Sequence, residues 1–256
     1  MTELLPIIFQ DEHLVAINKP SGLLVHRSAI DRHETRFAMQ ILRNQLGQHV
    51  YPVHRLDKPT SGVLLFALSS ECAQKAGEIF ARHQLQKTYL AIVRGHVAEH
   101  GTIDHPLREE RDACSDRKMR ENKPAQAALT EFIRLGTVEL PVAVDKYPSS
   151  RYSLVSCQPR SGRKHQIRRH LKHIDHPIIG DAKHGKGQHN RFFQQQYNAH
   201  RLLLAATELK LMHPYTGQAL NLCASLDDTF LGLLRAFDWY TAVPSSWLGN
   251  AQHALG

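Results

Sequence analysis

Residues 53–68 read Val-His-Arg-Leu-Asp-Lys-Pro-Thr-Ser-Gly-Val-Leu-Leu-Phe-Ala-Leu and carry the strongest structural signal in the chain. The apolar run at 63–68 follows Gly62 and precedes two serines, which is typical of a strand buried on both faces. Because Pro59 cannot donate to a sheet ladder, we expect the residues before it on a loop that enters the core. The sequence therefore predicts that Asp57 is a carboxylate at the mouth of an apolar interior, although an aspartate here can also serve only to cap a turn.

The composition allows a sizeable core and favours an anionic partner. The chain has 256 residues, of which 42% are hydrophobic, enough for one large domain or two small ones. Lysine and arginine number 32 against 24 acids, which gives a net charge of +8. A basic balance concerns association rather than fold, and nucleic acid is the first candidate partner.

Several classes of protein are not indicated. The four cysteines lie far apart in the sequence, so neither a zinc site nor a disulfide framework is predicted, and a cytoplasmic location is the simplest interpretation. The first twenty residues contain acids and lack the apolar core of a signal peptide, and no apolar run is long enough to span a bilayer. We therefore expect no membrane association.

Short apolar or alternating runs predict strands, and apolar residues at helical spacing predict helices. The predicted strands cover residues 4–9, 14–18, 23–26, 63–68, 87–95, 128–138, 152–157, 202–212 and 219–224. The predicted helices cover 37–46 with a stop at Gly47, 69–84 with a serine cap, and 227–237 with an aspartate cap. Strands and helices mix without a regular βαβ rhythm, which predicts an α+β fold.

Two segments are expected to lack regular structure. Residues 108–123 carry eleven charges of nearly balanced sign and almost no apolar side chains, so we expect a mobile, solvated loop, with a clamp on nucleic acid as the alternative. Residues 241–256 contain scattered proline, serine, glycine and asparagine and are expected to fray. The preceding residues, 1–240, are predicted to form a single domain.

The second informative segment, residues 160–173, holds six Lys or Arg, three His and no acid. Apolar residues at positions 167, 171 and 174 predict a helix with one narrow apolar stripe. At about 100° per residue, Arg168 lies beside that stripe, whereas Arg169, Lys172 and His173 face outward. Outward cations suit phosphate groups and Arg168 suits a pocket walled by the helix, while a merely solvated basic face is the alternative.

Three other chemistries fit the sequence poorly. The histidines at positions 165, 170, 173 and 176 lack a nearby cysteine and lie among cations, so no metal is expected. The glycine-rich segment 180–187 is close to a phosphate-binding loop, but Gly187 stands where a hydroxyl residue is required. The His-Arg-Leu-Asp run is one residue too long for a kinase catalytic loop, and no Gly-x-Ser-x-Gly motif is present.

The chain resembles the RluA-type RNA pseudouridine synthases in five motifs that occur in the family's order. The resemblance implies the pseudouridine synthase fold, which is a mixed, mainly antiparallel sheet flanked by helices with the active site in a central cleft. One departure is Ala205, where members often carry histidine, and we expect it to affect a detail of the cleft and not the chemistry. The motifs cover residues 18–26, 53–62, 87–89, 162–168 and 176–181.

The resemblance also implies roles for individual residues. Asp57 matches the essential catalytic aspartate, Arg168 the arginine that pairs with it, and Tyr89 the active-site tyrosine. Arg55 matches the arginine that enters the RNA where the reacting base has left. The further residues that we expect to bind RNA are Lys87, Arg163, Lys164, His165, Arg169 and Lys172.

The chemistry of this family is consistent with these residues. Converting uridine to pseudouridine breaks the N1–C1′ bond, rotates the uracil and joins C5 to C1′, so nothing is transferred from outside and no cofactor is expected. Uracil can leave as a delocalised anion, so one ionised carboxylate suffices, either attacking C1′ or removing the C2′ proton. A cation beside a carboxylate favours its ionised form, which is the expected role of Arg168. Tyr89 offers a face for the base and a hydroxyl for the C5 proton.

Within the family, the segments at 162–171 and 180–185 resemble the members that modify transfer RNA at uridine 65, in the T stem. We therefore expect a transfer RNA pseudouridine synthase that acts as a monomer. A ribosomal RNA target is the enzymatic alternative. A non-catalytic RNA-binding protein and a metal-dependent hydrolase are the alternatives from other classes.

Overall fold

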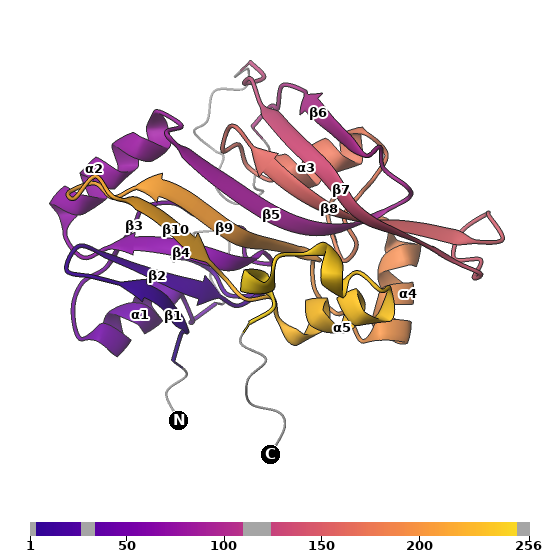
Figure 1. The fold of residues 1–256 in the computed structure, drawn as a ribbon, viewed down its shortest axis with the longest axis horizontal. Helices are drawn as coiled ribbons and strands as arrows, with labels where there is room; N and C mark the ends of the chain where they lie inside the picture. The colour runs from indigo at the N-terminus through magenta and orange to yellow at the C-terminus, as the bar shows by residue number, and fades with distance from the viewer. Residues whose placement is uncertain (1–3, 27–33, 110–123, 250–256) are drawn as a thin grey trace.

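The computed structural model describes residues 4–26, 34–109 and 124–249. Within these residues, ten strands form one sheet that is flanked by helices (Figure 1). The strands are β1 (Ile7–Gln10), β2 (Leu14–Lys19), β3 (Tyr51–Pro52), β4 (Ser61–Ala67), β5 (Leu85–Arg94), β6 (His100–Asp104), β7 (Leu129–Leu140), β8 (Ser150–Pro159), β9 (Leu204–Met212) and β10 (Ala219–Cys223). The helices are α1 (Ala38–Leu46), α2 (Ser70–Ala81), α3 (Gln166–His173), α4 (Gly187–Tyr197) and α5 (Asp228–Ala236), followed by two 3₁₀ helices, Tyr240–Ala242 and Ser245–Trp247.

The sheet is mixed and mainly antiparallel, which confirms the predicted fold class. Its strand order is β1-β2-β4-β9-β5-β8-β7-β6, with β3 paired to β4 and β10 paired to β9. Strands β4 and β9 are parallel, and all other pairings between the described strands are antiparallel. The parallel pair lies inside the sheet and brings together residues far apart in the sequence, such as Ser61 and Ala205.

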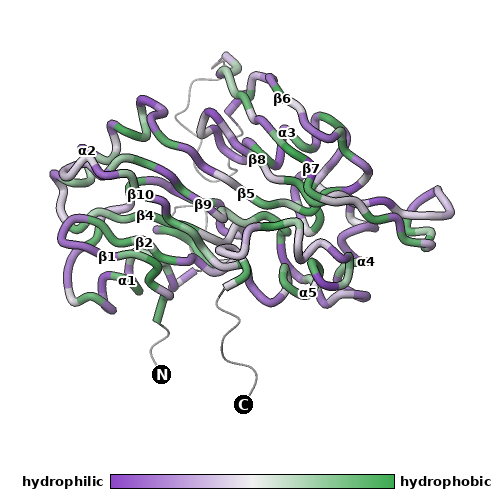
Figure 2. Tube along the Cα trace, viewed as in Figure 1, coloured by the Kyte–Doolittle hydropathy of each residue, from purple (hydrophilic) through white to green (hydrophobic). Residues whose placement is uncertain are grey.

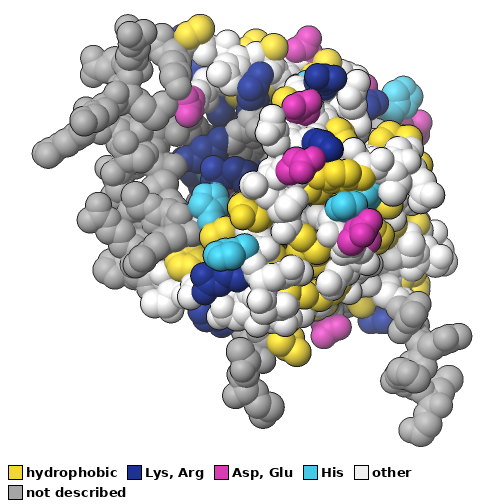
Figure 3. Space-filling view, turned by 90° about the vertical axis from the view of Figure 1, so that its left-hand side faces the viewer, with side chains coloured by type: hydrophobic (Ala, Val, Ile, Leu, Met, Phe, Trp, Pro, Cys, Tyr) yellow, Lys and Arg dark blue, Asp and Glu magenta, His cyan; other side chains and the backbone are white. Residues whose placement is uncertain are grey.

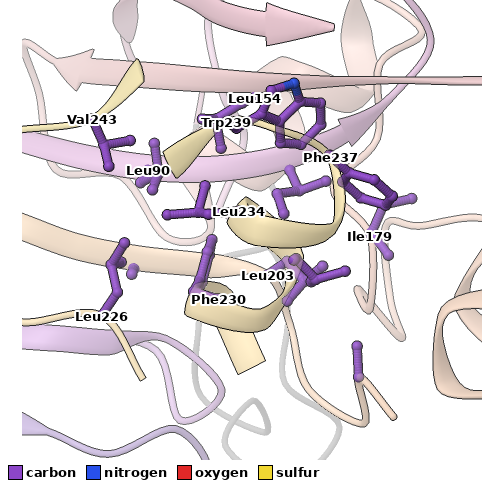
Figure 4. Close-up of a cluster of buried hydrophobic side chains, with 14 of the residues drawn as sticks. Leu90, Leu154, Ile179, Leu203, Leu226, Phe230, Leu234, Phe237, Trp239 and Val243 are labelled. Atoms are coloured by element: carbon purple, nitrogen blue, oxygen red, sulfur yellow. The ribbon is translucent and has the colours of Figure 1, made fainter. Parts of the chain in front are cut away.

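Successive residues of β5 face opposite sides of the sheet, and each side has its own core. Leu90 packs with α4 and α5, in the cluster that Figure 4 shows around Phe230 and Leu234. Ala91 packs on the other side, with apolar residues of α3. Figure 2 shows hydrophobic residues along the central strands and hydrophilic residues at many of the connecting turns. The side that carries α3 is the one that holds the candidate site described below.

Local signals in the sequence place several of these elements correctly. Ser69 caps α2 by accepting a hydrogen bond from Cys72 N (3.1 Å), and Asp227 caps α5 by accepting one from Phe230 N (3.1 Å). Helix α1 ends at Gly47, which has the left-handed conformation (φ 68°) that favours glycine. Strand β4 is buried along its whole length, as predicted for the apolar run.

Residues 23–26 do not form the predicted strand. Leu24 makes only an isolated bridge to Phe37. The carbonyl oxygens of Leu24 and Val25 instead accept hydrogen bonds from Ala38 N (2.8 Å) and Met39 N (3.0 Å), at the start of α1. These carbonyls satisfy donors that the first turn of a helix leaves unpaired. The sequence patterns also do not predict β6 or α4, which contain few apolar residues.

The expectation that residues 241–256 fray is wrong for the described part of that segment. Val243 and Trp247 are buried in the core cluster that contains α5. The backbone is held as well, because Trp247 O accepts a hydrogen bond from Leu226 N (2.7 Å). Burying a large aromatic side chain offsets the entropy that is lost when a short segment becomes ordered.

The predictions for residues 110–123 and 250–256 lie outside the described residues. Of the cysteines, Cys72, Cys157 and Cys223 are described, and all three are free thiols. None of the helices in the described ranges is both long enough and apolar enough to cross a bilayer.

Candidate active site

The loop that carries Asp57 leads directly into β4, at the point where β4 pairs with β9. Gly62 pairs with Ala206 in the short parallel ladder between these strands. Gly62 has φ 110°, and a Cβ atom at this position would collide with the backbone of Ala206. Glycine is therefore required here, because the two backbones approach too closely for any side chain. The preceding loop emerges from the middle of the sheet, between its two halves.

The turn at residues 18–22 holds this loop in place. Lys58 O accepts hydrogen bonds from Gly22 N (2.9 Å) and from Lys19 Nζ (3.2 Å). Pro59 O accepts a third hydrogen bond, from Ser21 Oγ (2.7 Å). The Asn-Lys-Pro-Ser-Gly motif and the Asp57 motif, which are separate in the sequence, thus form one hydrogen-bonded unit.

Lys19 is a fully buried cation in this unit. Its Nζ atom also donates to Pro20 O (2.9 Å) and Leu23 O (2.8 Å), so three carbonyls match the three N–H groups of the ammonium form. Burial and the charge of Arg201 lower the pKa of Lys19 to about 7, against the opposing charge of Asp57. The loop thus depends on a lysine that lies far from solvent.

His54 anchors the start of the same loop. Its Nε2 atom accepts a hydrogen bond from Leu65 N (3.1 Å), and its ring stacks on Phe80 (4.9 Å between centroids). Burial, followed by the charge of Lys87, lowers the pKa of His54 to about 3. At neutral pH this histidine is therefore an uncharged acceptor with a structural task.

Asp57 and Arg168 meet although they lie 111 residues apart in the sequence. Arg168 Nη1 donates to Asp57 Oδ2 (3.0 Å), and the Arg168 and Asp57 side chains are 7% and 22% exposed. The same guanidinium donates from Nε and Nη2 to both carboxylate oxygens of Asp181 (2.7 and 2.9 Å). The carboxylate that remains accessible is therefore that of Asp57.

The charges of this group stabilise each other. Burial alone would lower the pKa of Arg168, but the hydrogen bonds and charges of Asp181 and Asp57 hold it above its ordinary value. Burial alone would likewise raise the pKa of Asp181, yet the hydrogen bonds and charge of Arg168 hold it below its ordinary value. Arg168 and Asp181 are consequently both charged at neutral pH.

Tyr89 lies on β5 and packs against two apolar clusters, one that contains Leu56 and one that contains Ile167. Burial, followed by the charge of Asp57, raises the pKa of Tyr89 well above its ordinary value. The hydroxyl therefore stays protonated at neutral pH, and the expectation that it takes the C5 proton stays a prediction. Tyr89 also lines the cleft described below.

His165 provides a second nitrogen group near the carboxylate. It precedes α3 in the left-handed conformation (φ 55°), which turns the chain into the helix. Its Nε2 atom lies 3.9 Å from Asp57 Oδ2, and its Nδ1 atom lies 3.1 Å from His184 Nε2. Asp57 is thus approached by Arg168 on one side and by an imidazole on another.

These groups open into a cleft of about 500 Å³. Asp57 is its only acidic residue among the described ones, against several cations. Figure 3 shows one face of the molecule, on which Lys and Arg side chains gather around a hollow. The residues that line the cleft are His54, Arg55, Leu56, Asp57, Thr60, Phe80, Ala81, His83, Lys87, Tyr89, Pro159, Ser161, Gly162, Arg163, Lys164, His165, Gln166, Ile167, Arg168 and Leu204.

Most of the residues expected to bind RNA lie in this cleft. Arg55 and Arg163 are exposed at its wall, and Lys87 Nζ donates to Ser161 O (3.2 Å). Burial lowers the pKa of Lys87. Lys164 and His165 complete the set. The cleft therefore concentrates positive charge around one carboxylate.

Arg169 and Lys172 are not part of the cleft lining. Both lie on α3, where Arg169 Nη1 donates to Arg108 O (2.8 Å) and Lys172 is exposed to solvent. The structure thus separates them from the Asp57 group, and their expected role in binding RNA stays a prediction.

Comparisons with known proteins identify the family of this chain. A family model described as RNA pseudouridylate synthase matches residues 13–173, a segment that contains Asp57, Tyr89 and Arg168. The chain belongs to this family. It is therefore an RNA pseudouridine synthase.

Similar proteins match this synthase over almost its whole length. A protein of Vibrio cholerae named tRNA pseudouridine synthase C is 54% identical over 236 residues, which cover 92% of this chain and 97% of that protein. A protein of Yersinia pestis with the same name is 52% identical over 241 residues, which cover 94% of each chain.

Two solved human structures have a similar fold. Human RNA Pseudouridylate Synthase Domain Containing 4 has a TM-score of 0.67 at 30% identity and covers 91% of this chain and 93% of its own. Human RNA Pseudouridylate Synthase Domain Containing 1 has a TM-score of 0.68 at 26% identity, covering 92% and 88%.

Sequence reasoning missed some of the charged groups in this synthase and misplaced one residue. Asp181 and Lys19 both lie inside recognised motifs, but nothing local shows which partners they meet. Ala205 was expected to affect the cleft, but it is buried in the cluster that contains α5, and its neighbour Leu204 is the one that lines the cleft. Adjacent residues of a strand face opposite sides of the sheet, so the departure at Ala205 does not reach the cleft.

Among the described residues, no group of three or more His, Cys, Asp or Glu side chains is arranged to hold a metal ion.

Proposed function

We propose that this synthase isomerises a uridine of transfer RNA to pseudouridine, with Asp57 as the catalytic carboxylate. The observation that carries the proposal is the 22% exposed Asp57 side chain, which is held by Arg168 at 3.0 Å in a cleft lined with cations. The relatives named tRNA pseudouridine synthase C support transfer RNA as the substrate, because they match this chain over 92–94% of its length.

The reaction needs one carboxylate and no external group. Asp57 either attacks C1′ or removes the C2′ proton, and uracil leaves from N1 as a delocalised anion. The uracil then rotates and C5 bonds to C1′, while either the bond between C1′ and Asp57 breaks or Asp57 returns the proton to C2′. The proton on C5 is then lost and N1 takes up a proton, so the net change is the move of one proton from C5 to N1. All atoms of the uridine remain in the product. Arg168 favours the ionised form of the carboxylate that starts this sequence.

A uridine in a stem must leave the base stack before Asp57 can reach its sugar, at a cost of a few kcal/mol. The aromatic face of Tyr89 offsets part of this cost, since stacking of a base on an aromatic ring contributes about 1 to 3 kcal/mol. Arg55, exposed at the wall of the cleft, occupies the space that the base vacates. Lys87, Arg163 and Lys164 bind the neighbouring phosphates.

The target within transfer RNA is proposed from the resemblance of two segments. Residues 162–171 and 180–185 resemble members of the family that modify uridine 65 in the T stem. Both segments border the Asp57 group, because they contain Arg168 and Asp181. Mapping pseudouridine in RNA from cells that lack the gene tests the target. Loss of pseudouridine at position 65 of transfer RNA supports it, whereas loss confined to ribosomal RNA contradicts it.

The catalytic role of Asp57 is tested by Asp57→Asn, which keeps the shape of the side chain and removes its charge. We expect no pseudouridine from this variant and an RNA affinity within about threefold of the wild type, since binding depends on the surrounding cations. Asp104→Asn is the matched control, because it makes the same change of charge at an exposed site outside the cleft. Equal loss of binding and product, or full activity of Asp57→Asn, contradicts the proposal.

A further inference from the structure

We infer that Asp181 is a positioning residue for the isomerisation, which fixes the guanidinium of Arg168 so that one of its N–H groups reaches Asp57. The inference rests on the proposed catalytic role of Asp57. It adds a second carboxylate that never touches the RNA and acts only through Arg168.

The guanidinium of Arg168 makes different contacts along two of its edges. Nε and Nη2 of Arg168 donate to Oδ2 and Oδ1 of Asp181, at 2.7 and 2.9 Å, which is a bidentate pair that fixes the guanidinium plane. Nη1 alone donates to Asp57, at 3.0 Å. A single hydrogen bond leaves a guanidinium free to rotate about it, so contact with Asp57 cannot by itself determine where Arg168 lies.

Asp181 is itself fixed by a tight turn. Its Oδ1 atom accepts hydrogen bonds from Lys183 N and His184 N, both at 2.9 Å. Its carbonyl oxygen accepts from Gly185 N (3.1 Å) and from the side chain of Asn190 (3.0 Å). These hydrogen bonds hold the Asp181 side chain in one orientation. Its bidentate pair with Arg168 then fixes the orientation of the guanidinium.

The carboxylates of Asp57 and Asp181 differ in their exposure to the cleft. The Asp181 side chain is 0% exposed, whereas that of Asp57 is 22% exposed in the cleft. Asp181 cannot contact a substrate, so any effect that it has on the reaction passes through Arg168. Removing Asp181 from its pair would leave Arg168 free to move, and a displacement of about 1 Å near the reacting atoms can reduce a rate about 100-fold.

The test uses Asp181→Asn, Arg168→Met and the double variant Arg168→Met/Asp181→Asn. The asparagine has the same shape, but its amide group places a donor against a donor of Arg168. Single-turnover rate constants for pseudouridine formation and dissociation constants for the same unmodified transfer RNA are measured for each. We expect the rate of Asp181→Asn to fall by about 10- to 100-fold while the dissociation constant stays within about threefold.

The double variant shows whether Asp181 acts through Arg168. If it does, the double variant reacts within about threefold of Arg168→Met, because Asp181 has nothing left to position. Additive losses in the double variant, or an Asp181→Asn rate within about threefold of the wild type, overturn the inference. A loss of folded protein would raise the apparent dissociation constant while the rate falls, so an unchanged dissociation constant excludes a purely structural role.

Two further variants keep the outcomes distinct. Should Asp181→Asn fail to fold, Asp181→Glu retains the charge but moves the carboxylate by one methylene group. The same split between rate and affinity is then expected, and a wild-type rate overturns the inference. Asp57→Asn separates this inference from the proposed function, because an active Asp57→Asn contradicts the proposed function, whereas an inactive Asp57→Asn beside a fully active Asp181→Asn contradicts only the role of Asp181.

Discussion

Helix α3 has a buried side and an outer side, and basic residues occur on both. On the buried side, Arg168 is 7% exposed and makes three hydrogen bonds to two carboxylates. On the outer side, its sequence neighbour Arg169 donates to a backbone carbonyl, and Lys172 is exposed. Two adjacent arginines thus differ in their surroundings because a helix rotates them by about 100° relative to each other.

This difference shows why a cluster of basic residues cannot be assigned one role. A buried guanidinium must be paired, and its pairing fixes the carboxylates around it. An exposed cation contributes mainly a long-range attraction that salt weakens. Substitutions on the two sides of α3 should therefore change different measurements.

The largest effect is expected for Arg168→Ala on the buried side. This change leaves Asp181 buried without its cation, and breaking such a pair costs about 3 to 5 kcal/mol of unfolding free energy. The rate of pseudouridine formation should fall by at least about 100-fold, since Asp57 loses its partner as well. Urea denaturation and single-turnover assays measure the two effects. Arg169→Ala is the control and should change the unfolding free energy by less than about 0.5 kcal/mol; equal destabilisation by the two variants would contradict the comparison.

A smaller effect is expected from the histidines of the same helix. His170 is fully buried between Thr130 Oγ1 (2.9 Å) and the carbonyl of His105 (3.1 Å), and burial lowers its pKa. The unfolded chain then binds a proton that the folded chain does not, so this contribution to stability is lost as the pH falls below the ordinary value of 6.5.

The His170→Gln variant should therefore lose less stability than the wild type on acidification below pH 6.5. The difference in slope should be at most about 1.4 kcal/mol per pH unit, which corresponds to one proton. Urea denaturation at a series of pH values provides the measurement. A slope in His170→Gln equal to that of the wild type would contradict the assignment of this pH dependence to His170.

The smallest effect is expected for Lys172→Gln on the outer side. If Lys172 contacts a phosphate, the slope of log affinity against log salt concentration should decrease by about 0.9. The single-turnover rate at saturating enzyme should stay unchanged, because Lys172 is not part of the cleft lining. Binding assays at several salt concentrations measure the slope. An unchanged slope would remove Lys172 from the RNA-binding surface.

The sequence was informative wherever the signal was local. The apolar run after Gly62 predicted the buried strand β4, and the residues at Ser69 and Asp227 predicted helix caps that the structure contains. The apolar stripe around Ile167 predicted α3 and placed Arg168 beside it. The order of the family motifs gave the fold class. Apart from the order of the motifs, each of these features depends on residues within a few positions of each other.

Local signals were misleading where contacts between distant segments decide the outcome. The frayed tail was wrong at Trp247 because its composition does not show that a core is available to receive the side chain. The strand at 23–26 was wrong because its carbonyls bind the start of α1. The expected effect of Ala205 on the cleft was wrong because register determines which side of the sheet a residue faces.

By itself, the sequence determined most of the strands and helices, that the chain carries excess positive charge, and that Asp57 lies on a loop before a buried strand. The tertiary structure alone decided that Arg168 stands between Asp57 and Asp181. The physical reason is that periodicity and capping act within a few residues, whereas the pairing of β4 with β9 and the packing of α3 against the sheet bring these three side chains together from distant parts of the chain.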